Sequence, residues 1–272
     1  MNVVRKAWWK TALGVVLTAA MLFPLYWMIN VSFTQRSAIR DADLFPRAFT
    51  LDNYRVVLSD QLPYLGTSVI IGLGTVLVTL VISAPAAYAL SKLFVPGRRV
   101  LSFLLIVAQM IPAVVMALGF YSIYTNLGIL NTVPGLVLAD STIAVPFGVM
   151  LFSAFMAGIP NELLEAAEID GASYWRTFRS VVMPVSRNSA VTVGLFAFLW
   201  AWSDFLFAST LNRDGGALRP ITMGLYDYIG SQNQEWGPLM ATAVLASVPT
   251  AILLIVAQRY VAAGITAGAV KD

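Results

Sequence analysis

The sequence predicts an all-α membrane protein that crosses the lipid bilayer six times. Of its 272 residues, 58% are hydrophobic and only 11% are charged, whereas a soluble domain usually carries about 25% charged residues. The mean hydropathy is +0.77. Six apolar segments are long enough to span a hydrocarbon core of about 30 Å, which takes roughly 20 helical residues. Because backbone groups in lipid must be hydrogen-bonded within the protein, each segment is expected to be a helix.

The expected spans form a single membrane domain of residues 1–272. They cover residues 11–32, 66–90, 100–124, 134–157, 190–211 and 239–257. The first apolar run follows three basic residues, as in a signal peptide, but it exceeds the roughly 7–15 residues of a signal peptide's apolar core. We therefore expect a retained anchor. Four prolines inside the spans permit kinks, and they are Pro85, Pro112, Pro146 and Pro249.

The basic residues predict the orientation of the spans. Loops rich in Lys and Arg favour the cytoplasmic side, and eleven of the 17 Lys and Arg residues fall on one side of the six spans. They are Arg5, Lys6, Lys10, Lys92, Arg98, Arg99, Arg176, Arg179, Arg187, Arg259 and Lys271. Both termini and the loop of residues 159–189 are therefore expected in the cytoplasm. The pI near 9.2 follows from this topology and does not indicate nucleic-acid binding.

The residue types that the chain lacks exclude several kinds of chemistry. It contains no Cys and no His, which removes thiolate nucleophiles, the commonest general base and two common metal ligands. No Lys follows a Gly, so the phosphate-binding loop GxxxxGK[ST] is absent. We expect no catalytic residue, metal site or cofactor on this chain, and an intramembrane enzyme is a remote interpretation. If ATP drives the protein, a partner chain must bind the ATP and its Mg²⁺.

The loop of residues 159–189, which we call the hairpin, is acidic and helix-prone although it joins two apolar spans. Pro160 ends the fourth span, because proline cannot continue the helical hydrogen-bond ladder. Asn161 is a good N-cap for a helix over residues 162–169, which are mainly Glu, Leu and Ala. Gly171 is expected in the left-handed conformation that commonly ends a helix.

A second short helix is expected to begin at Ser173, an N-cap residue, and to close at Pro184. On the first helix, side chains at three- and four-residue spacing share a face. That face contains Leu163, Ala166, Ala167 and Asp170. Small alanines allow a close approach, and Glu165 and Asp170 offer negative charge to a basic partner. The hairpin is thus interpreted as a docking element and not as a reaction centre.

The hairpin resembles the EAA loop of ABC importer permeases, whose pattern is EAA, three residues, G, nine residues and I-x-L-P. Here Glu165-Ala166-Ala167 and Gly171 are followed at the same spacing by Val181-Val182-Met183-Pro184. In that family the loop is the coupling helix, which inserts into a cleft of a cytoplasmic ATPase subunit. The resemblance implies an ATPase-coupling role for Glu162, Leu163, Glu165, Ala166, Ala167, Asp170, Gly171 and Pro184.

Other stretches resemble carbohydrate importer permeases of the maltose/glycerol-phosphate type. They are FTLDNY (49–54), AAYALSK (86–92), LGILNTVPGLVL (127–138) and WAWSDFLFA (200–208), and the tail QRYVAAGITAGAVKD (258–272) is similar to the MalG-like half of such pairs. ALGFY (117–121) departs from relatives that place a proline before the aromatic residue. The likeness covers nearly the whole chain.

This resemblance implies a type I ABC importer permease fold in a bacterial inner membrane. It also implies three protein partners: a second permease that forms a heterodimer with this chain, a dimer of ATP-binding subunits, and an extracytoplasmic sugar-binding protein. The carbohydrate is the cargo, and the C-terminal tail is expected to contact the ATPase dimer.

Acidic residues within the spans leave two alternatives open. Asp204, flanked by Trp200 and Trp202 in the fifth span, fits either a wall of the sugar path or a structural role, as a contact between helices or an anchor at the membrane interface. An alternative function is a secondary transporter or channel that uses Asp204 for ion coupling. Asp140, early in the fourth span, is expected at a solvated helix end near the outer mouth.

Overall fold

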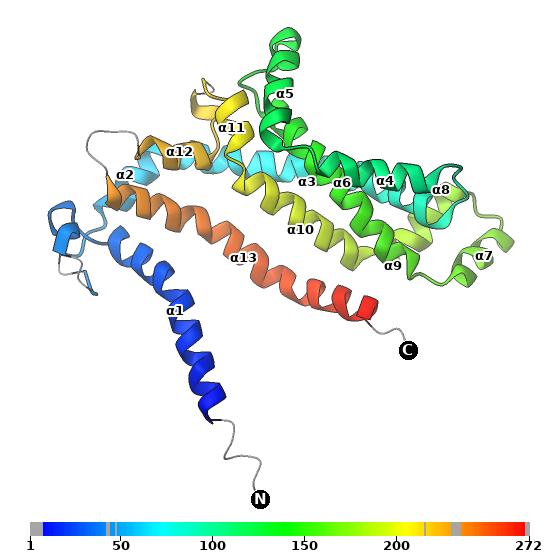
Figure 1. Ribbon diagram of the computed structural model, residues 1–272, viewed down its shortest axis with the longest axis horizontal. Coiled ribbons are helices and arrows are strands. Elements are labelled where there is room, and N and C mark those ends of the chain that lie inside the picture. The colour runs from blue at the N-terminus through cyan, green and yellow to red at the C-terminus, as the bar shows by residue number, and fades with distance from the viewer. Residues whose placement is uncertain (1–7, 42–43, 47, 215, 230–234, 270–272) are drawn as a thin grey trace, which may run out of the picture. The chain divides into compact units, whose positions relative to one another are not determined.

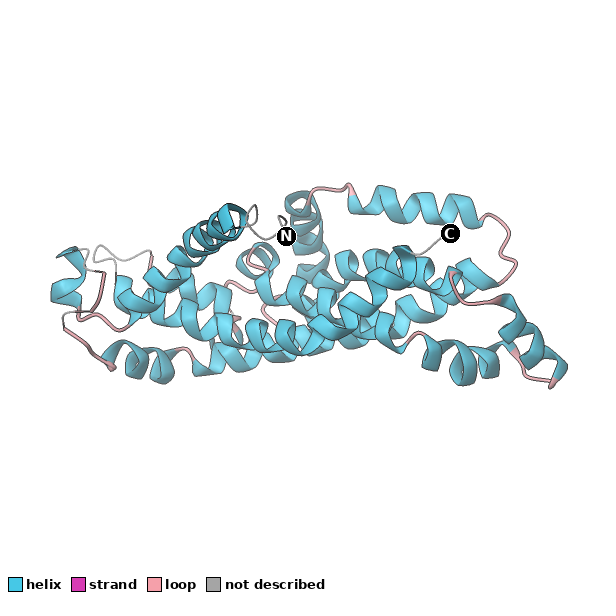
Figure 2. Ribbon diagram, turned by 90° about the horizontal axis from the view of Figure 1, so that it is seen from below, coloured by secondary structure: helices cyan, strands magenta, loops and turns pink. Residues whose placement is uncertain are grey.

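The computed structural model of the chain is helical in the regions that it describes (Figures 1 and 2), which are residues 8–41, 44–46, 48–214, 216–229 and 235–269. In these regions the extended structure is limited to one antiparallel bridge between Thr34 and Phe49. The predicted all-α fold class is confirmed. The chain divides into two units, residues 1–62 with 224–248 and residues 63–223 with 249–272, which are described separately.

The smaller unit is organised around a buried asparagine of the stretch FTLDNY. Its elements are α1 (Trp8–Ser32), the 3-10 turn η2 (Arg36–Asp41), α2 (Asp52–Asp60) and the first turns of α13 (Trp236–Ala269). The Asn53 amide donates hydrogen bonds to the backbone oxygens of Ser32 at 2.9 Å and Thr34 at 3.1 Å. A Cβ atom at Gly237 would lie 2.5 Å from Asn53 Oδ1, so α13 packs against this asparagine only because residue 237 is glycine.

The larger unit contains three helices that lie side by side: α3 (Leu62–Lys92), α6 (Val133–Ala157) and α10 (Arg187–Ser203) (Figure 1). It also holds α4 (Arg98–Gln109), α5 (Ala113–Leu127), α11 (Leu206–Leu211), the 3-10 turn η4 (Gly216–Leu218) and the later turns of α13. The short helix α12 (Ile221–Asp227) begins in this unit.

Glycines allow the three long helices to approach closely. A Cβ atom at Gly72 on α3 would lie 2.7 Å from the Phe198 ring on α10, and one at Gly148 on α6 would lie 3.0 Å from Ser83 Oγ on α3. Small residues at helix contacts are typical of membrane helices, because close backbone approach replaces the hydrophobic driving force that is absent in lipid. The packing of α3 against both neighbours therefore depends on these positions.

The helices account for the six expected spans with two important differences. Among the described residues, four helices are long and apolar enough to cross a membrane, and the number rises to six if each of two bent helix pairs is one span. The four are Trp8–Ser32, Leu62–Lys92, Val133–Ala157 and Trp236–Gln258. Their bounds lie within four residues of those expected from the sequence.

The third expected span, residues 100–124, is wrong as a single helix. It divides into α4 and α5, which meet at an angle of 92°. Pro112 stands as the N-cap of α5 with an extended backbone, φ −59° and ψ 130°. Proline lacks the N–H that would continue the ladder, and it disfavours helical geometry in the residue before it. The chain therefore turns sharply here instead of bending slightly.

The fifth expected span, residues 190–211, is likewise divided. Helix α10 ends at Ser203, and α11 begins at Leu206. Asp204 lies at the break with ψ 126°, and its carboxylate accepts hydrogen bonds from the backbone N–H groups of Phe207 at 3.1 Å and Ala208 at 2.9 Å. These are bonds to the first turn of α11, which is the pattern of an N-terminal cap. Asp204 is thus a helix-capping residue at a break and does not lie within a continuous helix.

The expectation for Asp140 is also wrong. This residue is only 1% exposed on α6, whereas a solvated helix end was expected. It lies in the second turn of a helix that begins at Val133, and neighbouring helices cover it. Its Oδ1 atom has no hydrogen-bond partner among the described residues. The adjacent hydroxyls of Ser141 and Thr142 instead donate to carbonyl oxygens of their own helix.

Candidate functional site

The hairpin consists of two helical limbs joined by a sharp turn (Figure 1). The first limb is α7 (Asn161–Ile169). The second limb comprises α8 (Tyr174–Thr177), the π-helical turn η3 (Phe178–Val182) and α9 (Met183–Val185). The second limb then bends by 79° into α10. A π-helical turn is rare and is frequent at functional sites.

The turn between the limbs has the geometry that the sequence predicts. Gly171 has φ +72°, in the left-handed region that favours glycine. Its N–H donates to the Glu168 carbonyl at 2.9 Å, and the Ala172 N–H donates to the Ala167 carbonyl at 2.9 Å, so the last carbonyls of α7 are satisfied. Ser173 caps α8 as predicted, since its side chain accepts from the Arg176 N–H.

Two details of the predicted hairpin are wrong. Pro160, and not Asn161, is the N-cap of α7, so Asn161 is its first residue and its side chain makes no cap bond. Pro184 stands one residue before the end of the second limb, because the helix continues to Val185. The limb is continuous from Tyr174 to Val185, so Pro184 lies in its last turn, where its missing N–H weakens the helical hydrogen-bond ladder without ending the helix at once.

One face of α7 is exposed and combines acidic with apolar side chains. Ala167 is the predicted coupling residue that faces the protein, at 9% exposure. The other predicted residues on α7 are exposed, and they are Glu162, Leu163, Glu165, Ala166 and, at the C-cap, Asp170. Ile169 is 87% exposed, and the sequence reading missed it. The sequence feature that could have indicated this exposure is an isoleucine at the end of a short acidic helix. On the surface of the chain alone, such a side chain has no apolar neighbour to pack against.

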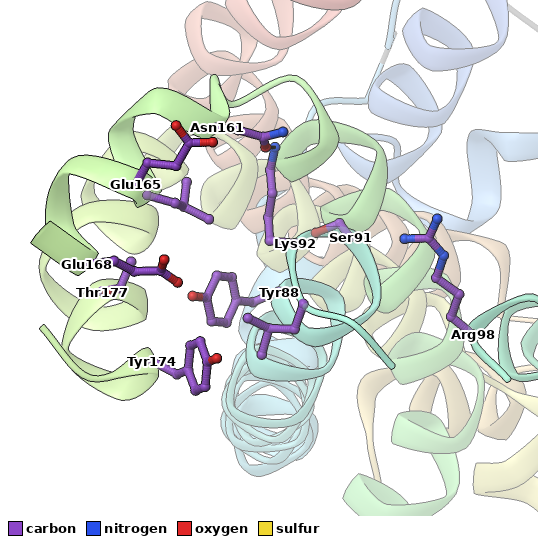
Figure 3. Close-up of a pocket in the computed structure, with 11 residues that line it drawn as sticks. Tyr88, Ser91, Lys92, Arg98, Asn161, Glu165, Glu168, Tyr174 and Thr177 are labelled. Carbon is purple, nitrogen blue, oxygen red and sulfur yellow. Dashed lines mark hydrogen bonds between the residues drawn. The ribbon is translucent and has the colours of Figure 1, made fainter. Parts of the chain in front are cut away.

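A cavity of about 360 Å³ lies between the hairpin and the last turns of α3 and the start of α4 (Figure 3). Its walls carry charged and aromatic side chains from both limbs and from α3 and α4. They are Tyr88, Ser91, Lys92, Leu93, Arg98, Asn161, Leu164, Glu165, Glu168, Tyr174 and Thr177. Figure 3 shows the Glu168 carboxylate and the Tyr88 hydroxyl turned toward each other across it.

Lys92, the last residue of α3, reaches the start of the hairpin. Its ammonium group donates to the backbone oxygen of Ile159 at 2.5 Å, to Asn161 Oδ1 at 3.0 Å and to the backbone oxygen of Ala157 at 3.4 Å. Figure 3 places Lys92 and Asn161 next to each other. Because α6 ends at Ala157, the lysine charge meets the negative end of the α6 dipole and its unpaired carbonyls.

Tyr88, one turn earlier on α3, contacts the second limb. Its ring packs on Phe178 of the π-helical turn with 5.4 Å between the ring centroids, and Trp175 packs on the same Phe178 at 5.2 Å. Both Tyr88 and Phe178 are buried, and they belong to an apolar cluster with Phe152 and Val182. The sequence reading missed this role of Tyr88 and Lys92, although both lie in AAYALSK.

The residues predicted to line a sugar path lie outside the hairpin and do not share one surface. Trp202 is buried and stacks on Phe198 with 5.4 Å between ring centroids, whereas Trp200 is 43% exposed. Residues two apart on a helix point in nearly opposite directions. Asp204 is half-buried and serves as the cap of α11. Their part in a path stays a prediction.

The family follows from a match across most of the chain. Residues 79–267 fit the family model described as "binding-protein-dependent transport system inner membrane component". The chain belongs to this family. The resemblance to ABC importer permeases is therefore confirmed, and with it the location of the chain as an inner-membrane component of a transport system.

Relatives of this chain are similar to it along nearly the full length. The chain is 32% identical over 270 residues to the trehalose transport system permease protein SugB of Mycobacterium tuberculosis (strain CDC 1551 / Oshkosh), covering 98% of both chains. It is 32% identical over 265 residues to the trehalose/maltose transport system permease protein MalG of Thermococcus litoralis, covering 95% of both.

Solved structures share the fold. A chain of a bacterial ABC transporter involved in the import of the acidic polysaccharide alginate superposes with a TM-score of 0.80 at 22% identity, covering 92% of this chain and 94% of that one. A chain of the MetNI methionine ABC transporter gives a TM-score of 0.61 at 14% identity, covering 79% and 99%. The predicted type I importer permease fold is thus confirmed.

Proposed function

We propose that this chain is the MalG-like permease of an ATP-driven carbohydrate importer, and that its hairpin couples ATP use on a partner chain to movement of its helices. The exposed face of α7 carries this proposal. It combines Glu162, Glu165 and Asp170 with the apolar side chains of Leu163 and Ile169. Apolar groups surrounded by charge at a surface indicate a protein contact, and the acids select a basic partner.

The proposed partner at this face is an ATP-binding subunit, present as a dimer that holds ATP and Mg²⁺. A second permease completes a heterodimer, and an extracytoplasmic binding protein delivers the cargo. The apolar surface of α1 supports a contact with the membrane or with a partner, since none of its 18 most apolar consecutive residues is buried by the chain itself. The distribution of basic residues supports a cytoplasmic position for both termini and the hairpin.

The proposed cargo is a carbohydrate of two or more sugar units. Relatives of 29–32% identity are named for trehalose, for trehalose and maltose, and for diacetylchitobiose. Identity at this level supports the substrate class more than any single sugar. Trp200, on the exposed side of α10, is the residue of the predicted path that can offer an aromatic face to a sugar ring.

Ion-coupled transport through Asp204 has no comparable support. Its two carboxylate oxygens already accept hydrogen bonds from the first turn of α11. An ion-coupling carboxylate would have to exchange these bonds for an ion in each cycle, which would release the start of that helix.

Uptake in sealed vesicles tests the proposal against this alternative. The chain should be reconstituted with its proposed partners and supplied with labelled disaccharide. We expect uptake to stop when ATP is removed and to continue when ionophores dissipate the proton and sodium gradients. Uptake that survives ATP removal but stops with the ionophores would overturn the proposal.

A further inference from the structure

Helix α3 contacts the hairpin but is not continuous with it in the sequence. The chain runs directly from α6 through the hairpin into α10, so these two helices follow any movement of the hairpin through their backbone. Helix α3 instead continues into α4 through residues 93–97. Movement of α3 with the hairpin therefore depends on non-covalent contacts, which are its packing along α6 and α10 and its contacts with the hairpin itself.

Two residues on the last turns of α3 make hydrogen-bond and ring contacts with the hairpin itself. Tyr88 and Lys92 are four residues apart, so they lie on the same face of the helix. Lys92 contacts the linker that leads into the first limb, and Tyr88 contacts the π-helical turn of the second limb. One face of α3 thus holds both limbs, which is a stronger constraint on their relative position than either contact alone.

The chemistry of each contact suits its position. A lysine ammonium has three N–H donors, and Lys92 directs them at the three acceptors of Ala157, Ile159 and Asn161. This satisfies carbonyls that the end of α6 leaves without helical partners. Tyr88 is only 5% exposed and Phe178 only 6%, so their ring contact excludes water.

We propose that Tyr88 and Lys92 form a two-point clamp, by which α3 moves with the hairpin when the ATPase partner moves it. The clamp rests on the proposed function, because it needs a partner that drives the hairpin. Its residues are positioning residues and do not touch the cargo. A side chain on each limb completes it, Asn161 on the first and Phe178 on the second.

Helix α3 can carry this movement to the opposite end of the unit. It has 31 residues, so at 1.5 Å per residue it is about 46 Å long. Near its start, Ser68 Oγ accepts a hydrogen bond from the backbone N–H of Ile221 at 2.8 Å, at the first residue of α12. Rigid secondary-structure elements are one of the physical means by which distant sites are coupled.

The test compares transport with ATP hydrolysis in the reconstituted importer. Lys92→Met keeps the length of the side chain and removes its donors. We expect the ATPase to co-purify and hydrolyse ATP, while disaccharide uptake per ATP falls about tenfold, the factor that corresponds to about 1.4 kcal/mol of lost charge-assisted hydrogen bonding. Lys92→Arg should restore most of the coupling, because it keeps charge and donors.

Matched substitutions separate the clamp from general damage to α3. Tyr88→Phe should leave coupling unchanged, since the ring makes the contact with Phe178, whereas Tyr88→Ala should lower it. Ser91→Ala should also leave it unchanged, because the Ser91 hydroxyl bonds to Ala87 of its own helix. Full coupling in both Lys92→Met and Tyr88→Ala would overturn the clamp.

A reversible cross-link supplies a second measurement, which decides the matter if Lys92→Met does not assemble. The chain has no Cys, so Lys92→Cys with Asn161→Cys creates a unique thiol pair. A short bifunctional thiosulfonate should bridge it and raise uptake per ATP back toward the unsubstituted level, and reduction should abolish the gain. A bridge that stops uptake would show that α3 and the hairpin must separate, which contradicts the clamp.

Failure of the clamp and failure of the proposed function give different results. If the unsubstituted importer shows no ATP-driven uptake, the proposed function is wrong. If the unsubstituted importer is active and Lys92→Met and Tyr88→Ala are as well coupled as it is, the function holds and the clamp is wrong.

Discussion

The acids of the hairpin and the acids of the long helices have opposite surroundings. Glu162, Glu165 and Asp170 are exposed on α7, whereas Asp140 is buried on α6 and Asp204 is half-buried after α10. An exposed carboxylate keeps its hydration and can exchange it for a partner at little cost, but a buried one must find bonds inside the chain. The comparison separates carboxylates that are available to bind a partner protein from carboxylates that have a structural role within the chain.

The two inner acids also differ from each other. Asp204 accepts two backbone hydrogen bonds and thereby starts α11. Asp140 makes no hydrogen bond to any described residue through its Oδ1 atom. A carboxylate within the packed helices can therefore raise or lower the stability of the protein, and the hydrogen bonds that it accepts determine which effect it has. Four predictions test this comparison, and they are given from the largest expected effect to the smallest.

The turn that presents the hairpin acids should be the most sensitive position. We expect Gly171→Pro to abolish ATP-driven uptake, because proline holds φ near −65° and cannot adopt the observed +72°. It also removes the N–H that bonds to Glu168. A Cβ atom at this position would meet nothing within 4 Å, so Gly171→Asn, which tolerates the left-handed conformation, is the control and should stay active. Normal uptake by Gly171→Pro would contradict a role of the turn.

Charge reversal on the exposed face should weaken docking. We expect Glu165→Lys to lower co-purification of the ATPase subunit about tenfold, because like charges placed against each other at an interface are strongly unfavourable. Asp60→Lys reverses another exposed acid, on α2 of the smaller unit, and should leave co-purification unchanged. Equal retention of the ATPase by both variants would count against this face.

Removal of the cap at the helix break should reduce stability without changing docking. We expect Asp204→Ala to lower the free energy of unfolding by about 1–2 kcal/mol, as the loss of an N-cap does. Asp204→Ser keeps a capping oxygen and should cost less. Thermal unfolding in detergent measures both, and an unchanged midpoint for Asp204→Ala would show that the cap is not needed.

Replacement of Asp140, whose buried Oδ1 atom has no hydrogen-bond partner among the described residues, should have the smallest effect on stability and should raise it. Threonine has nearly the volume of aspartate, and its hydroxyl can donate to the carbonyl one turn earlier, as the Ser141 hydroxyl does at 2.6 Å. We therefore expect Asp140→Thr to raise the unfolding midpoint, by about 2–4 °C for each kcal/mol gained. A lower midpoint would show that Asp140 has a favourable interaction in the membrane.

The sequence predicts the long helices well, because an apolar run of the length of the bilayer leaves the backbone little choice. It fails at the breaks, since a count of apolar residues does not register how a helix ends. Pro112 and Asp204 lie within the expected spans, and the sequence predicts a kink at Pro112 and a continuous helix through Asp204. A proline, which lacks the backbone N–H, and a short polar side chain that caps a helix are both local signals of a helix end. A hydropathy average over a whole span does not register them.

The hairpin was predicted more completely than its surroundings. Gly171 and Ser173 act through bonds to neighbouring residues, so their roles can be inferred from local spacing alone. Lys92 and Ile159 are 67 residues apart, and Tyr88 and Phe178, whose rings are in contact, lie still farther apart in the sequence. Contacts of that kind depend on how α3 packs against α6, which no local pattern contains.

The π-helical turn at Phe178–Val182 has a consequence for how the second limb is oriented. Such a turn holds one residue more than an α-helical turn of the same height. Deletion of Ser180, an exposed residue within it, would let the segment close into an ordinary α-helix. The part of the hairpin before this turn would then keep nearly the same direction relative to α9, because the wider π-helical turn and an α-helical turn each complete one revolution. A one-residue deletion elsewhere in the second limb would instead rotate the tip of the hairpin by about 100° about the helix axis.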